Sequence, residues 1–132
     1  MKIIKMAAIL ATVSLIMGVA QAGEVCPITH SPVQSEDQAL DLAIKVTKAF
    51  KLTTIPVEHC LHFYVDQSTD KAGGYVVTVR ENHNQECGGD PDTEPRVFDL
   101  EIKPDGQVAT DAFPITGDGT SMRRLHCWSS KR

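Results

Sequence analysis

The segment from Gly74 to Lys103 decides the fold, and it reads GYVVTVRE (74–81), NHNQECGGDPDTEP (82–95) and RVFDLEIK (96–103). The two outer runs alternate apolar and polar side chains, a pattern typical of half-buried antiparallel strands. The 14 residues between them are too many for a tight hairpin, and loops of this length in compact domains are usually functional or tethered. The segment therefore predicts the two central strands of an antiparallel sheet, joined by a loop that is the candidate working surface.

A helix is expected ahead of these strands. Residues 35–38 read Ser-Glu-Asp-Gln, a capping box whose two acids face the positive end of the helix dipole. Thr53 and Pro56 oppose helical backbone, so we expect a helix of about 16 residues that ends near Lys51. Its broad apolar face, which is expected to pack on the sheet, comprises Leu40, Leu42, Ala43, Ile44, Val46, Ala49 and Phe50.

Two more strands complete the predicted sheet. Residues 61–66 alternate cleanly, and residues 107–112 form a short last strand after the tight-turn sequence Pro-Asp-Gly at 104–106. Because sequential antiparallel strands usually lie side by side, the fold class is α+β, with one N-terminal amphipathic helix packed on a four-stranded antiparallel meander that disulfides staple. One helix covers only one face, so the chain's tail or a partner is expected to cover Val76 and Val97 on the other.

Residues 1–22 have the features of a cleaved signal peptide. Lys2 and Lys5 precede an almost unbroken apolar run, and Ala-Gln-Ala at 20–22 is a small-residue cleavage site. A membrane anchor is the alternative, but the apolar run is shorter than the roughly 20 residues that a spanning helix needs. We therefore expect export to a bacterial periplasm, or secretion beyond it, with residues 23–132 as a single α+β domain that has no membrane contact after cleavage.

The exported part of the chain is acidic. The whole sequence has 13 basic and 17 acidic residues, and the signal segment holds two lysines and no acid, so residues 23–132 carry 11 basic residues against 17 acidic ones. The resulting net charge, about −6 with neutral histidines, argues against a nucleic-acid partner, because such a partner requires a basic surface.

Four cysteines lie outside the signal segment, at positions 26, 60, 87 and 127. An even number in an oxidising compartment predicts two disulfides, and no Cys-x-x-Cys or Cys-x-x-His pair supports the zinc alternative. Three pairings are available for four cysteines. We favour Cys26–Cys60 with Cys87–Cys127, because the second bond would hold the acidic loop against the basic tail residues Arg123, Arg124, Lys131 and Arg132.

Three stretches carry a family resemblance: ALDLAI at 39–44, GYVVTV at 74–79 and FDLEIKPDGQV at 98–108. Together they resemble a PepSY-type domain, in a pattern that spans roughly residues 36–112. The resemblance implies a small exported module in which a helix precedes a meander, and an association with peptidase inhibition. The 14-residue loop and the four cysteines are additions to that pattern.

Catalytic and metal-binding alternatives are weaker. His83 and Cys87 lie four residues apart and could form a thiolate pair, but a disulfide is the default state of Cys87 in an oxidising compartment. His59 and His62 supply only two ligands, which are too few for a metal site. Residues 66–70 resemble the start of a calcium loop but lack its glycine and its final glutamate, so they predict a turn. We therefore expect a protein that is not an enzyme and holds no metal or cofactor.

The predicted function is protein binding. An acidic, tethered loop suits the cationic cleft of a partner enzyme, because complementary charge speeds association and confers specificity. The protein is thus predicted to be a small periplasmic inhibitor or immunity-type protein that acts on a cell-wall hydrolase, peptidase or toxin. The alternative is a structural or stress accessory domain of the cell envelope with no enzyme target. The candidate binding residues are Glu86, Gly88, Gly89, Asp90, Asp92, Glu94 and Arg96.

Overall fold

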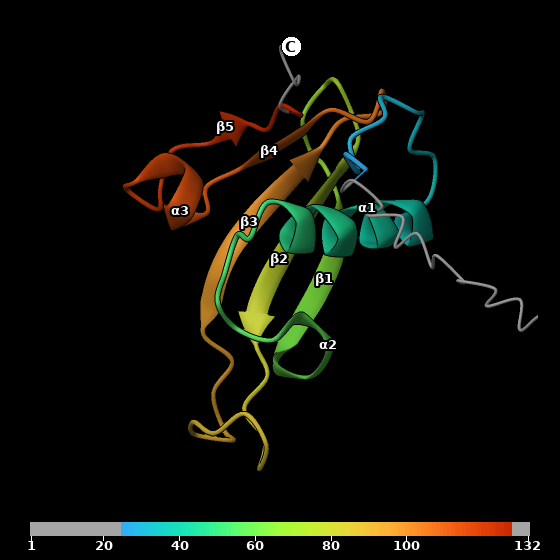
Figure 1. Cartoon of the computed structure of the whole chain (residues 1–132). Coiled ribbons are helices and arrows are strands. Elements are labelled where there is room, and N and C mark those ends of the chain that lie inside the picture. The colour runs from blue at the N-terminus through green and yellow to red at the C-terminus, as the bar shows by residue number, and fades with distance from the viewer. Residues whose placement is uncertain (1–24, 128–132) are drawn as a thin grey trace, which may run out of the picture.

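An antiparallel sheet forms the body of the protein, and one helix lies across one of its faces (Figure 1). The computed structural model describes residues 25–127, so the predicted signal peptide and the tail residues Lys131 and Arg132 lie outside the described residues. Within the described range, no helix is long and apolar enough to cross a membrane. The elements follow in the order α1 (Glu36–Ala49), α2 (Val57–Cys60), β1 (Leu61–Gln67), β2 (Tyr75–Glu81), β3 (Arg96–Ile102), β4 (Val108–Thr110), α3 (Phe113–Thr116) and β5 (Arg123–Arg124).

Helix α1 begins at the predicted capping box. The backbone N–H of Gln38 donates to Ser35 Oγ at 3.2 Å, and the Gln38 side chain accepts the backbone N–H of Gln34 at 2.7 Å. These bonds satisfy amide groups that have no partner within the helix. The helix has 14 residues and ends at Ala49, earlier than predicted, because the backbone of Lys51 turns to a positive φ of 50°.

Small side chains bring α1 close to the sheet. Ala39, Ala43 and Val46 are completely buried, and α1 lies against β1 and β2. Leu42 and Ile44, which were predicted to lie on the buried face, are only half-buried, because the alanines allow a close approach that leaves larger neighbours at the edges of the contact. The sheet contributes the rest of the central core through Val77, Val79, Phe98, Leu100 and Ile102.

The Pro-Asp-Gly turn forms as predicted between β3 and β4. The backbone N–H of Lys103 donates to the Gln107 carbonyl at 2.8 Å, and that of Gly106 donates to the Lys103 carbonyl at 2.9 Å. Gly106 has a φ of +82°, and a Cβ there would lie 2.5 Å from the Ser31 carbonyl oxygen. Glycine is therefore required for both the turn and the contact with the N-terminal arm.

The sheet has five strands rather than the predicted four, in the order β1-β2-β3-β4-β5. The additional strand β5 is a two-residue segment in which Arg124 pairs with Ala109 and Arg123 pairs with Thr110. Two adjacent arginines carry no alternating pattern, so the sequence gives no strand signal there. The tail thus extends the edge of the sheet and does not cover its second face.

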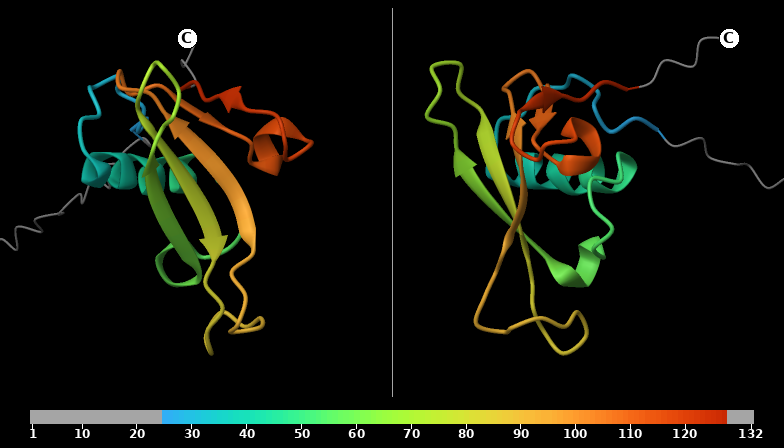
Figure 2. Two further views of the ribbon diagram at one scale, coloured as in Figure 1. Left: turned by 180° about the vertical axis from the view of Figure 1, so that it is seen from behind. Right: turned by 90° about the vertical axis from the view of Figure 1, so that its left-hand side faces the viewer.

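That second face is open in the described part of the chain. Figure 2 shows the helices gathered on one side of the sheet and the strands uncovered on the other. On the open face His62 of β1 lies opposite Arg80 of β2, and Tyr64 lies opposite Thr78. The register shifts between Val79 and Arg80, so that Arg80 pairs with Arg96 of β3. The open face is therefore mainly polar next to the loop that joins β2 and β3.

The favoured disulfide pairing was wrong. The bonds join Cys26 to Cys127 and Cys60 to Cys87, with Cα–Cα distances of 5.8 and 5.6 Å. Topology explains the difference. Residue 60 immediately precedes β1, and Leu61 pairs with Glu81 at the end of β2, so Cys60 lies beside the start of the loop. Arg123 and Arg124 are held in β5, away from that loop (Figure 1), and Cys127 instead reaches the N-terminal arm.

Candidate binding loop

The loop of residues 82–95 projects from one end of the sheet, where β2 ends and β3 begins (Figures 1 and 2). Its base is closed by backbone hydrogen bonds. The N–H of Glu81 donates to the Pro95 carbonyl, and the N–H of Asn82 donates to the Cys60 carbonyl, both at 2.9 Å. The Cys60–Cys87 disulfide then holds the first half of the loop against the end of α2. The loop is therefore fixed at its base and along its first half.

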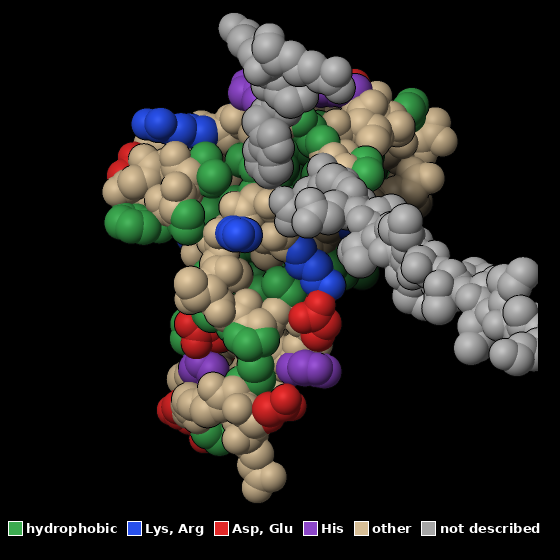
Figure 3. All heavy atoms as spheres, viewed as in Figure 1, with side chains coloured by type: hydrophobic (Ala, Val, Ile, Leu, Met, Phe, Trp, Pro, Cys, Tyr) green, Lys and Arg blue, Asp and Glu red, His purple; other side chains and the backbone are tan. Residues whose placement is uncertain are grey.

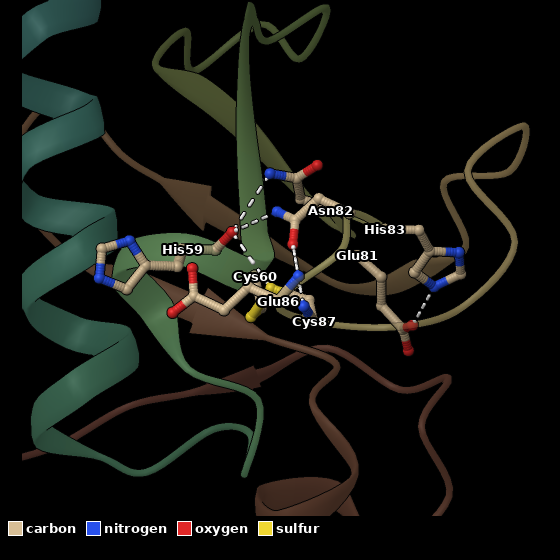
Figure 4. Close-up of a disulfide and its surroundings, with 8 residues drawn as sticks. His59, Cys60, Glu81, Asn82, His83, Glu86 and Cys87 are labelled. Atoms are coloured by element: carbon tan, nitrogen blue, oxygen red, sulfur yellow. Dashed lines mark hydrogen bonds and ion pairs between the residues drawn. A yellow bond between two sulfur atoms is a disulfide. The ribbon is translucent and has the colours of Figure 1, made fainter.

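Asn84 shapes the turn that presents Cys87 to Cys60. Its side-chain oxygen accepts the backbone N–H groups of Glu86 at 3.0 Å and of Cys87 at 2.9 Å, an arrangement in which asparagine stabilises a turn. The side-chain amides of Asn82 and Asn84 donate to the His59 carbonyl at 3.2 and 3.3 Å (Figure 4). The two asparagines, which the sequence reasoning did not single out, thus hold the loop against the end of α2 beside the disulfide.

His83 braces the second half of the loop. Its Nε2 atom lies 2.6 Å from a Glu81 carboxylate oxygen, and its Nδ1 atom lies 2.8 Å from the Asp90 carbonyl oxygen. Both neighbours are acceptors, and an imidazole donates from both nitrogens only when it is protonated. The Glu81 carboxylate and, to a smaller extent, the Asp90 carbonyl accordingly raise the pKa of His83. The residue weighed as a partner for a Cys87 thiolate is therefore a structural brace.

Gly89 allows this brace to form. It has a φ of +83°, and a Cβ at this position would lie 2.6 Å from atoms of the His83 ring. Gly88 also has a positive φ, of 75°, but nothing lies within 4 Å of the Cβ position there. Both glycines were candidate binding residues. Their backbone conformations shape the loop, and only Gly89 also provides space for a side chain.

Glu94 anchors the end of the loop on the open face of the sheet. Its carboxylate accepts hydrogen bonds from the Tyr64 hydroxyl and from His62 Nδ1, each at 2.8 Å, and its backbone carbonyl accepts one from Arg80 at 3.0 Å. The Tyr64 hydroxyl, followed by His62, lowers the pKa of Glu94, and the carboxylate in turn raises the pKa of Tyr64. Alternation along β1 places His62 and Tyr64 on one face, but no sequence pattern connects them with Glu94.

Arg96, the last of the candidate binding residues, lies at the start of β3 and pairs with two carboxylates of the fold. Its guanidinium group lies 3.0 Å from the Asp99 carboxylate and also contacts the carboxylate of buried Asp111. These acids, Asp99 foremost, raise the pKa of Arg96. Asp111 also accepts the backbone N–H of Asp99 at 2.8 Å. Arg96 thus neutralises a buried carboxylate beside β3, while its own side chain stays exposed.

Three carboxylates remain on the outside of the loop. Glu86, Asp90 and Asp92 are exposed, and the side chains of Glu86 and Asp92 have no hydrogen-bond or ion-pair partner in the described part of the chain. Asp90 accepts the backbone N–H of Asp92 at 3.0 Å with one oxygen. Figure 3 shows Asp, Glu and His side chains gathered at this end of the molecule. Of the seven candidate residues, these three therefore form the outward acidic surface.

The cysteines and histidines at the loop end of the molecule determine which chemistry is possible there. Cys87 is bonded to Cys60, and none of the four cysteines is free. Among residues 25–127, no group of three or more His, Cys, Asp or Glu side chains is arranged to hold a metal ion. A shallow cavity of about 360 Å³ lies beside the disulfide, bordered by Ile55, His83 and Glu86. The loop end of the molecule is thus an exposed acidic surface that a disulfide cross-links to α2.

Comparison with known proteins adds no relative. No protein family model matches this sequence, and neither the curated proteins nor the solved structures contain a match. The resemblance to PepSY-type domains therefore stays a prediction, and any functional proposal must rest on the geometry of the loop.

Proposed function

We propose that this protein is a small exported protein-binding module, an inhibitor or immunity-type protein that inserts the loop of residues 82–95 into the cationic cleft of a partner enzyme. A cell-wall hydrolase, a peptidase or a toxin would provide such a cleft. One observation carries the proposal: the loop holds its own shape through a disulfide and side-chain braces, while the carboxylates of Glu86, Asp90 and Asp92 face outward.

Preorganisation is what makes this loop suited to binding. A flexible loop loses conformational freedom when it binds, at about 0.5–1.5 kcal/mol for each side chain that becomes ordered. Here the Cys60–Cys87 bond, the His83 brace and the Glu94 anchor have already restricted the backbone. Binding to a partner should therefore cost little additional ordering of the loop.

The charge of the protein favours a cationic partner. The chain carries a net charge of −4 with its signal segment, and an acidic surface accelerates encounter with a basic cleft. Exposed ion pairs add little affinity individually and are screened by salt. The proposal therefore predicts association that is fast and sensitive to ionic strength, with specificity set by the shape of the loop.

The test uses two double variants that change the net charge equally. Glu86→Gln with Asp92→Asn removes the two outward carboxylates that have no partner in residues 25–127 and leaves the braces of the loop in place. Glu36→Gln with Asp66→Asn removes two exposed acids elsewhere and serves as the matched control. Each oxidised protein is immobilised and exposed to periplasmic extract, and the captured proteins are quantified by mass spectrometry.

The loop proposal expects a protein that the wild type and the control capture and that the loop variant loses. The wild type should then inhibit the captured enzyme in a one-to-one titration, whereas the loop variant should not. Equal capture by all three proteins would contradict the proposal, and it would favour the alternative of an envelope accessory domain without an enzyme target.

A further inference from the structure

A second concave surface lies at a different part of the molecule from the acidic loop. It is a groove of about 510 Å³ between the end of α1, α3 and β5. Its apolar floor includes Phe50, Ile115 and Leu125, and its polar lining consists of Lys51, Arg124 and His126. None of its lining residues belongs to the loop of residues 82–95, so this groove is independent of the surface proposed above.

The charge of the groove is opposite to that of the protein as a whole. No acidic side chain lines it, although the complete chain carries a net charge of −4. Lys51 and Arg124 are exposed cations at its rim. Figure 3 shows basic side chains over β5 and near the end of α1. The groove therefore favours a ligand that carries negative charge.

The backbone at Lys51 adds a separate observation. This residue follows the end of α1 with a φ of +50°, a left-handed conformation that glycine adopts at much lower cost and that commonly ends helices. The chain nevertheless has a lysine at this position, on the rim of the groove. A strained non-glycine residue on the rim of a groove points to a role for its side chain.

The apolar floor and the sheet edge narrow the choice of ligand. Phe50 and Ile115 are partly buried against the hydrophobic core and can receive one apolar side chain. β5 pairs with β4 and is the last strand of the sheet. No strand among residues 25–127 pairs with its other edge, so this edge can align an extended segment. An anionic membrane fits less well, because the groove is concave and the net negative charge of the protein opposes approach to such a surface.

We propose that this groove binds an extended acidic segment of a partner protein. Carboxylates of that segment pair with Lys51 and Arg124, a ring N–H of His126 donates a further hydrogen bond, and an apolar side chain of the segment packs on Phe50 and Ile115. The protein then has two binding surfaces of opposite charge, an acidic loop and a basic groove.

The test uses variants that separate this role from folding. Lys51→Gly removes the cation and supplies the residue that the left-handed backbone favours, so folding should be unaffected or improved. Arg124→Ser removes the second cation. The matched controls are Arg123→Ser, at the neighbouring position of β5 outside the groove lining, and Lys71→Gly, at an exposed position in the β1–β2 turn. The probe is a fluorescein-labelled six-residue peptide that alternates aspartate and leucine, and its binding to the oxidised full-length exported chain is followed by fluorescence anisotropy.

The wild type and both controls should bind the probe saturably, and Lys51→Gly and Arg124→Ser should each weaken binding by about fivefold. A peptide with lysine in place of aspartate should not bind. Equal binding by all variants, or no saturable binding, would overturn the proposal. Preference for vesicles that contain phosphatidylglycerol would assign the surface to membranes instead. Binding that emerges only after removal of residues 128–132 would assign the groove to the chain's own end.

Discussion

Removal of the Cys60–Cys87 disulfide tests the link between the cross-link and the shape of the loop. Cross-linking two residues limits the conformations of the unfolded chain, and the effect grows with the number of residues enclosed. The sequence separation of 27 corresponds to about 3.5 kcal/mol. Small domains have a total stability of about 5–15 kcal/mol. The variant with Cys60→Ser and Cys87→Ser should therefore still fold, because Cys26–Cys127 and the core are unchanged.

The two disulfides predict different patterns of change, which makes the comparison informative. Cys26–Cys127 has a sequence separation of 101, and its removal should cost about 4.7 kcal/mol. It should nevertheless leave the loop of residues 82–95 as protected from amide hydrogen exchange as in the wild type. Removal of Cys60–Cys87 should cost less stability than removal of Cys26–Cys127. It should selectively expose the backbone amides of positions 86 and 87 to hydrogen exchange.

Urea denaturation gives the free energy of unfolding, and hydrogen exchange measured by mass spectrometry gives the protection of the loop. Peptide mapping without reduction identifies the disulfide bonds. Unchanged protection of the loop in the variant that lacks Cys60–Cys87 would refute the reasoning, because the side-chain braces alone would then hold the loop. Recovery of a peptide that links Cys26 to Cys60 would refute the topology itself.

Three further predictions concern the loop. The pKa of His83 is raised in the folded protein, so its brace should stabilise the fold fully at a pH below the pKa of an unfolded histidine, about 6.5. This contribution should be lost as the pH rises through the pKa of folded His83. The free energy of unfolding should therefore vary less with pH in His83→Gln. Glu94→Gln should lower the pKa of Tyr64 towards its ordinary value of 10.0, measured by the ultraviolet absorbance of tyrosinate. Gly88→Ala should lower the free energy of unfolding by about 1 kcal/mol through the positive φ alone. Gly89→Ala should lower it more, because only Gly89 lies against the His83 ring. Equal losses of stability in urea denaturation would contradict this.

The elements with a local signal could be predicted from the sequence. The capping box of residues 35–38 placed the start of α1, and alternation in residues 74–81 and 96–103 placed β2 and β3, because one buried face imposes a period of two on a strand. The Pro-Asp-Gly turn was also predictable, because the backbone conformations that such a turn requires are met by specific residues. β5 was missed because its two arginines carry no pattern and pair only after α3 has reversed the chain.

The disulfide pairing could not be derived from the spacing of the cysteines, because it depends on which segments of the chain meet in three dimensions. Cys60 and Cys87 are brought together by the β1–β2 register, in which Leu61 pairs with Glu81. The charge argument for joining the loop to the tail failed for a related reason. Exposed ion pairs contribute little, whereas the backbone pairing of Arg123 and Arg124 with β4 determines where the tail lies.

The division of charged residues at the loop also follows from register. The shift between Val79 and Arg80 places Arg80 opposite Arg96, and two cations in such close proximity each require an acceptor. Arg80 donates to the Glu94 carbonyl and Arg96 pairs with Asp99 and Asp111, so these contacts of Glu94 and Arg96 stabilise the base of the loop. The Glu94 carboxylate accepts hydrogen bonds from Tyr64 and His62, whereas the side chains of Glu86 and Asp92 have no partner in residues 25–127. Partner binding should therefore depend on Glu86 and Asp92, while the shape of the loop depends on Glu94.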